Sequence, residues 1–157
     1  MVDIKDLLEY NKQVRQRYLQ ALTRIPWEEL TRNREASFNS IRNIFIHTLK
    51  AIDYWLDVLL NEQNCKAKQY KKYKNLEEIC EYKDYVEERM QSYLDNSFSG
   101  ALSKKYVIRT DLGTEEEVTA EDILIHLFEE EVHHRGELIA LLWQINIEPP
   151  LMGWKYL

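Results

Sequence analysis

Apolar residues recur at three- and four-residue spacing in four separate parts of the chain, as they do on one face of a helix. These parts are residues 3–24, 40–60, 76–94 and 119–145. Residues 106–119 alternate weakly between apolar and polar side chains, which predicts an extended loop or a small hairpin. Residues 61–74 show neither pattern and are expected to form a loop. The pattern therefore predicts four long helices.

Residues that cap helices stand where three of these helices should begin. Either Ser37 or Ser40 can cap the second helix, Asn75 can cap the third, and Thr119 opens a capping-box pattern at the fourth. Four amphipathic helices joined by short or medium connections form a bundle. We therefore expect an all-α fold, a four-helix bundle, in a single domain that spans residues 1–157.

Composition and charge narrow the range of functions. The chain has 157 residues with only 4 Gly and 3 Pro, which argues against sandwiches and barrels with their many turns. A net charge of −6 argues against nucleic-acid binding, and no apolar run approaches the roughly 18 residues of a membrane span. Cys65 and Cys80 form neither a C-x-x-C pair nor a disulfide framework. We expect a cytoplasmic protein without a nucleic-acid or membrane partner.

The last predicted helix carries ionisable side chains inside its apolar stripe. Successive helix residues rotate by about 100°, so Glu130 and His134 lie one turn apart on the same side. Ile123, Leu127 and Leu138 fall on that side too. Burying a carboxylate or an imidazole alone costs on the order of a few kcal/mol. A metal ion that takes both as ligands would offset this cost.

The other three histidines differ in their positions. His47 lies at the margin of the apolar face of the second helix, where a histidine alone is usually a hydrogen-bonded core residue. Together with Glu130 and His134 it would complete a three-ligand site with open positions. His126 lies at the edge of the stripe, and a pocket wall, a surface position and a ligand role all stay open. His133 points toward the polar face, which favours a surface or supporting role.

Other motifs of metal and catalytic sites are incomplete or absent. Glu131-x-x-His134 and Glu130-x-x-His133 match half of a ferritin-like di-iron motif, but no other histidine has a glutamate three residues before it. H-E-x-x-H, G-x-S-x-G, the P-loop and G-x-G-x-x-G are all missing. Asn11 is expected to be a structural, hydrogen-bonded residue, and Glu131 with Arg135 a structural ion pair.

Two segments of the sequence look like the signatures of one family. Residues 40–47 end in His47, and residues 130–138 read Glu-Glu-Val-His-His-Arg-Gly-Glu-Leu, which looks like the pattern H-x-x-H-H-R-G-Q. Together with Tyr10-Asn11, they make the chain resemble the DinB/YfiT-like superfamily over essentially its whole length. This resemblance implies a four-helix bundle in up-down-down-up order, which is usually dimeric.

The resemblance also implies one divalent metal ion, most often zinc or nickel, held by three side chains. Carried over by position, the ligands are His47, Glu130 and His134. Glu130 stands where the family usually has histidine, and two histidines with one carboxylate also suit iron(II), so iron or manganese stays open. Characterised relatives include S-transferases that use bacillithiol or mycothiol. The implied activity is transfer of a low-molecular-weight thiol to an electrophilic small-molecule substrate.

Two other functions remain open at this stage. One is hydrolysis at the metal, with Glu129, Glu131 or His126 assisting proton transfer. The other is a non-enzymatic metal-binding sensor or stress protein. The lysine-rich segment Lys66–Lys74 is either a solvated connector or a basic rim that meets carboxylates of a thiol cofactor.

A second apolar surface on the last helix predicts a homodimer. It comprises Phe128, Val132, Ile139 and Trp143, nearly opposite Glu130. Part of it is expected to lie under the 106–119 segment or under the tail, whose Trp154 could pack back. A two-fold axis would bring the uncovered part of this surface against the same surface of a second chain. Gly136 would allow the two helices to approach closely there.

Overall fold

The computed structural model describes the backbone of residues 3–110 and 112–153, and the side chains of these residues except 97–100. The long helices in this part of the chain are α1 (Ile4–Leu22), α3 (Ile41–Leu60), α4 (Leu76–Ala101) and α5 (Ala120–Gln144). The short elements are α2 (Trp27–Thr31), η1 (Tyr70–Lys72), β1 (Lys105–Arg109) and β2 (Glu115–Thr119). The four predicted helices are therefore confirmed.

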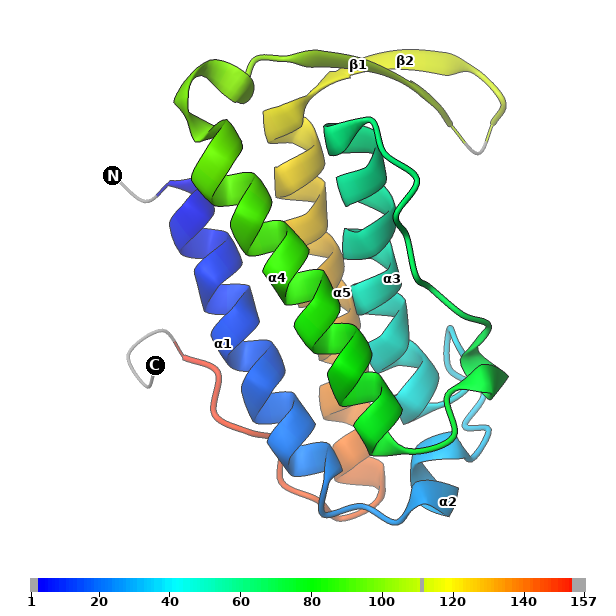
Figure 1. Cartoon of the computed structure of the whole chain (residues 1–157). Helices are drawn as coiled ribbons and strands as arrows, with labels where there is room; N and C mark the ends of the chain where they lie inside the picture. The colour runs from blue at the N-terminus through cyan, green and yellow to red at the C-terminus, as the bar shows by residue number, and fades with distance from the viewer. Residues whose placement is uncertain (1–2, 111, 154–157) are drawn as a thin grey trace.

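The helices form a bundle in up-down-down-up order. Figure 1 shows α1 and α5 running in one direction and α3 and α4 in the other. The connection over residues 61–75 produces this order, because it runs back along the length of the bundle before α4 begins (Figure 1). Helix α5 packs against both α1 and α3, and α4 closes the other side by packing against the same two helices.

The long helices begin at side-chain caps that satisfy otherwise unpaired backbone N–H groups. Asp3, Ser40, Asn75 and Thr119 each accept a hydrogen bond from the backbone N–H three residues later. The caps at Asp3 and Thr119 are full capping boxes. Of the two candidates at α3, Ser40 is the cap, and Ser37 is free to bond elsewhere.

The structure adds three details to the predicted elements. Helix α2 was not predicted, because five residues after a proline carry no helical period. Helix α4 extends to Ala101, beyond the last residue of its apolar period at Leu94. The 106–119 segment is a hairpin, in which Lys105 pairs with Thr119 and Arg109 with Glu115. The predicted return of Trp154 lies outside the described residues.

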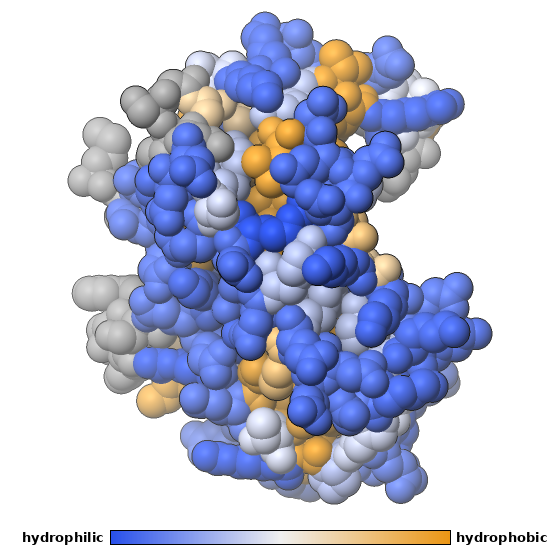
Figure 2. All heavy atoms as spheres, viewed as in Figure 1, coloured by the Kyte–Doolittle hydropathy of each residue, from blue (hydrophilic) through white to orange (hydrophobic). Residues whose placement is uncertain are grey.

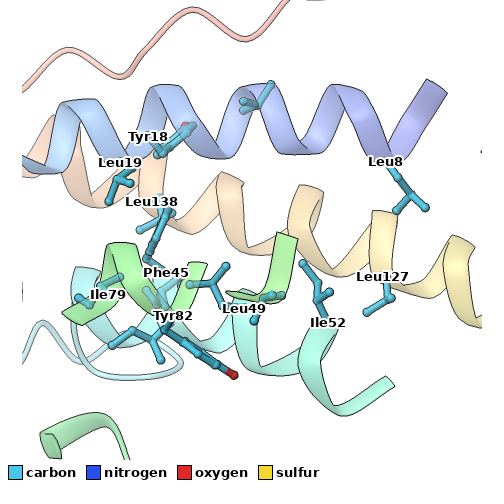
Figure 3. Close-up of a cluster of buried hydrophobic side chains, with 14 of the residues drawn as sticks. Leu8, Tyr18, Leu19, Phe45, Leu49, Ile52, Ile79, Tyr82, Leu127 and Leu138 are labelled. Atoms are coloured by element: carbon cyan, nitrogen blue, oxygen red, sulfur yellow. The ribbon is translucent and has the colours of Figure 1, made fainter. Parts of the chain in front are cut away.

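The core fills the space between the four long helices (Figure 3). Figure 3 shows side chains from all of them converging: Leu8, Tyr18, Leu19, Phe45, Leu49, Ile52, Ile79, Tyr82, Leu127 and Leu138. The face seen in Figure 2 is mostly hydrophilic, with apolar atoms in narrow patches. Among the described helices, none combines the length and apolar character that a membrane crossing needs.

A buried ionic network joins α1 to α4 and α5. The Arg15 guanidinium donates to both carboxylate oxygens of Glu131, at 2.6 and 3.1 Å, and to Glu87 at 2.6 Å. Lys83 donates to the second oxygen of Glu87 at 2.8 Å. Arg15 and Glu131 are each under 9% exposed, so both charges depend on this pairing to remain inside the bundle.

The expected ion pair between Glu131 and Arg135 is wrong, because α1 supplies the partners of both residues. Glu131 binds Arg15, whereas Arg135 donates to Asn11 Oδ1 at 2.9 Å. Asn11 also donates to the backbone oxygen of Phe128 at 3.3 Å and is fully buried, which confirms its structural role. Helix α1 therefore holds one polar side of α5.

Replacing Arg15 by leucine is expected to lower the free energy of unfolding by about 3–5 kcal/mol, because the Glu131 carboxylate loses its buried partner. Urea unfolding followed by circular dichroism measures the change. Arg24→Leu is the matched control, since Arg24 is exposed and its replacement should change stability by less than about 0.5 kcal/mol. Equal effects of the two substitutions would contradict the role assigned to Arg15.

Candidate metal centre

Three side chains of the ligand type meet between α3 and α5. His47 Nε2 lies 2.7 Å from Glu130 Oε1, and His134 Nε2 lies 3.1 Å from the same oxygen. The ligand atoms of all three residues lie within 4.8 Å of one another. The structure thus brings together the three residues that the sequence singles out as candidate metal ligands.

The size and chemistry of this cluster fit a divalent ion. Zinc binds histidine nitrogen and carboxylate oxygen at about 2.0–2.2 Å, which sets neighbouring ligand atoms about 3.3 Å apart. The two contacts at 2.7 and 3.1 Å need only a small expansion to reach that spacing. In the described part of the chain, the cluster contains three candidate ligands and no fourth. Such a set leaves coordination positions open.

His134 gives an independent reason to place a cation here. Its Nε2 faces Glu130 and its Nδ1 lies 2.6 Å from Glu137 Oε2. A neutral imidazole carries one N–H, and an ionised carboxylate only accepts hydrogen bonds. One of the two contacts is therefore unsatisfied in the neutral ring, and a metal ion between Nε2 and Glu130 would satisfy it.

Two aromatic side chains from outside the long helices, Phe38 and Tyr70, contact His47. The Phe38 ring stacks on His47, with 3.8 Å between ring centroids and an interplanar angle of 19°, and its edge contacts His134. Tyr70 Oη lies 3.5 Å from His47 Nδ1. Lys50 Nζ lies 4.5 Å from the centre of the Tyr70 ring. Phe38 thus covers one face of the His47 ring, and Tyr70 lies beside its Nδ1 atom.

The electrostatics of the site favour the deprotonated ligands. Burial lowers the pKa of His47, and the nearby Glu130 only partly offsets this effect. Burial alone raises the pKa of the Glu130 carboxyl, but the hydrogen bond from His47 and the proximity of His134 outweigh it and leave that pKa below its ordinary value. Neutral imidazole and ionised carboxylate are the forms that bind metal ions.

The remaining sequence candidates are not part of the cluster of His47, Glu130 and His134. His126 is exposed and its ring meets the edge of Trp55, which favours the surface alternative for this residue. His133 is exposed, as predicted. In the segment Lys66–Lys74, Lys66 lies 3.9 Å from the centre of the Tyr85 ring, so it packs against α4 instead of facing His47.

Sequence reasoning assigned no ligand-supporting role to four residues that the structure places beside the candidate ligands. Glu137 follows His134 by three residues, and this spacing on a helix could have identified it. Ser37, Phe38 and Tyr70 come from irregular segments. No periodicity signals their position, because only the tertiary fold brings them to α3 and α5.

Comparison with known proteins places the chain in a family. No protein with a curated description matches it. The family model described as DinB family matches residues 1–155, which is nearly the whole chain. The bundle order and the paired segments that carry the resemblance agree with this match. The chain therefore belongs to the DinB family.

Proposed function

We propose that this protein binds one divalent metal ion, zinc or nickel before iron or manganese, and uses it to transfer a low-molecular-weight thiol to an electrophilic substrate. The observation that carries the proposal is the convergence of His47, Glu130 and His134 on one point between two helices. Cys65 and Cys80 are both free thiols, which suits the reducing cytoplasm where such a cofactor would stay reduced.

The positions of the candidate proton carriers favour thiol transfer over hydrolysis. Glu131 is bound bidentately by Arg15, so its carboxylate is already engaged. His126 packs against Trp55, and Glu129 is exposed. Hydrolysis at a metal needs a group that moves the proton of water. A thiol, whose pKa is near 8.5, needs less assistance.

The chain's own residues would position the reactants. A bound divalent ion supplies Lewis acidity that favours the thiolate at neutral pH. His47, Glu130 and His134 would hold the ion with three protein ligands, and an open coordination position would be left for the thiol. The thiolate sulfur then forms a bond to the electrophilic carbon, and the leaving group departs with the electron pair of its own bond. The thiol proton passes to solvent.

A three-ligand cluster also separates this proposal from the non-enzymatic alternative. Structural zinc sites are almost always closed by four protein ligands. The cluster of His47, Glu130 and His134 contains three among the described residues. The open position supports a site that exchanges ligands.

Cobalt(II) in place of zinc tests the function directly, because sulfur bound to cobalt gives a charge-transfer absorption. We expect this absorption when bacillithiol, mycothiol or cysteine is added to the cobalt-loaded protein. His134→Ala should weaken metal binding more than about 100-fold and abolish the signal, while circular dichroism stays helical. His126→Ala is the control and should behave as the unmodified protein. Cobalt binding without any thiol signal would contradict the proposed activity.

Metal affinity is expected to fall as the pH is lowered, because a proton competes with the ion at each ligand. The pKa of His47 is lowered by burial, so its ligand form persists to below about pH 6.5 and is lost at lower pH. Chelator competition between about pH 7.5 and pH 4.5 measures the trend. Affinity that stays constant or rises on acidification would argue against imidazole ligands.

The homodimer is proposed on the outer face of α1 and α5. A groove of about 720 Å³ lies there, lined by Leu7, Tyr10, Phe128, Val132, Arg135, Gly136, Ile139 and Met152, among others. Val132 is 43% exposed, and Trp143 on the same helix is 57% exposed. The tail covers only part of this face, where Tyr10 donates to the backbone oxygen of Met152.

Gly136 leaves room for a second copy in this groove. Apart from its two chain neighbours and the backbone of its own helix, no described atom lies within 4 Å of the position that a Cβ would take there. A close approach by another helix of the same chain is therefore not the reason for this glycine. A two-fold contact, in which each copy covers the groove of the other, would use the open space.

Light scattering is expected to give twice the chain mass of 18.9 kDa. Val132→Glu should shift the protein to monomer, because it places a charge in the proposed contact. Val107→Glu is the control, since Val107 is 67% exposed on the hairpin, away from the groove. A monomeric unmodified protein at micromolar concentration would contradict the dimer.

A further inference from the structure

A hydrogen bond of 2.6 Å joins His134, a candidate ligand, to Glu137, which is not one of the three ligands. His134 Nδ1 and Glu137 Oε2 form it, across less than one turn of α5. The same carboxylate oxygen accepts a hydrogen bond from Ser37 Oγ at 2.9 Å. Glu137 is only partly exposed and does not touch His47 or Glu130 in any recorded contact of the described residues.

This contact is the shorter of the two that His134 makes with carboxylates, which favours Nδ1 as the nitrogen that carries the proton. An ionised carboxylate can only accept, so the N–H of a neutral imidazole must sit on Nδ1 to meet Glu137. Nε2 is then left with its lone pair. Nε2 is the atom that points to Glu130, 3.1 Å away, where the ion would bind. The opposite tautomer would turn an N–H toward the ion.

We propose that Glu137 is a positioning residue that sets the tautomer and orientation of His134 for metal binding. This inference rests on the proposed metal centre and assigns it a further residue. A carboxylate that accepts from the far nitrogen of a histidine also strengthens that ligand, and removing such a partner typically costs 10–100-fold in metal affinity.

The loop before α3 links the His134–Glu137 hydrogen bond to His47. Ser37 donates to Glu137, and the next residue, Phe38, stacks on the ring of His47. One short segment therefore contacts His47 directly and holds His134 through Glu137. His47 is thus contacted on its ring face and His134 at Nδ1, and both contacts leave the Nε2 atoms directed at Glu130. Contacts of this kind orient metal ligands.

A second metal ion is the rival explanation for the same residues. The ligand atoms of His133, His134 and Glu137 also lie within 4.8 Å of one another. Two observations favour positioning. His133 is exposed, and Glu137 Oε2 already accepts hydrogen bonds from His134 and Ser37. An ion there would have to displace the Nδ1 proton of a ring whose Nε2 already serves the first site.

Zinc affinity, measured by competition with a chromophoric chelator, provides the first test. Glu137→Ala is expected to weaken zinc binding about 10–100-fold. Glu137→Gln keeps an acceptor oxygen without its charge, so it should lose less. Glu129→Gln is the matched control, because it removes one negative charge from an exposed residue beside Glu130 without touching a histidine. Its affinity should stay within about twofold of the unmodified protein.

Nitrogen NMR of the imidazoles gives a readout that a merely structural role would not change. The chain has only 4 histidines, so His134 can be assigned by substitution. In the zinc-loaded protein we expect a proton on Nδ1 of His134 that exchanges slowly with water. Glu137→Ala should speed up this exchange, and Glu137→Gln should restore part of the protection.

Three outcomes would overturn the inference. Zinc affinity of Glu137→Ala equal to that of Glu129→Gln would show that Glu137 does not support the ligand. A second zinc ion, lost in both His133→Ala and Glu137→Ala, would make Glu137 a ligand in its own right. If the unmodified protein binds no divalent metal, the proposed function fails as well. The first two outcomes leave that function standing.

Discussion

Burial of charged side chains on two sides of α5 is the constraint on which the rest of the structure depends. Glu131 and Arg135 face α1, where Arg15 and Asn11 satisfy them. Glu130 and His134 belong to the same turns but meet α3. Because unpaired charges are costly inside a protein, α5 can occupy its place only if both neighbouring helices supply polar partners.

The charged side chains on the two sides of α5 differ in how completely their hydrogen bonds are satisfied. On the α1 side, a guanidinium fork meets a carboxylate in a closed, structural arrangement. On the α3 side, two imidazoles share one oxygen of Glu130, and His134 has carboxylates at both nitrogens. The surplus of acceptors on that side is what a cation would neutralise. The closed side thus positions α5, and the incomplete side is where we propose that the metal ion binds.

The sequence predicted the parts of this arrangement that depend on helical periodicity. The four long helices, and the shared face of Glu130 and His134, follow from the 3.6-residue repeat. His47 was a candidate from its place at the margin of an apolar face, and the resemblance assigned it as a ligand and supplied the order of the helices. The partner of Glu131 could not be predicted, because an i, i+4 spacing to Arg135 says nothing of a helix that packs alongside. Phe38 and Tyr70 lie in irregular segments, and only the folded chain brings them to His47.

X-ray absorption spectroscopy of the zinc-loaded protein, without added thiol, tests the central claim most directly. The account predicts a zinc ion bound by nitrogen and oxygen at about 2.0–2.2 Å, with the outer-shell scattering of two imidazoles. Both features should disappear in His47→Ala and in His134→Ala. Zinc–sulfur scattering at about 2.3 Å would contradict the account, because only cysteine or methionine of the chain could provide that sulfur. A zinc site without imidazole scattering would contradict it as well.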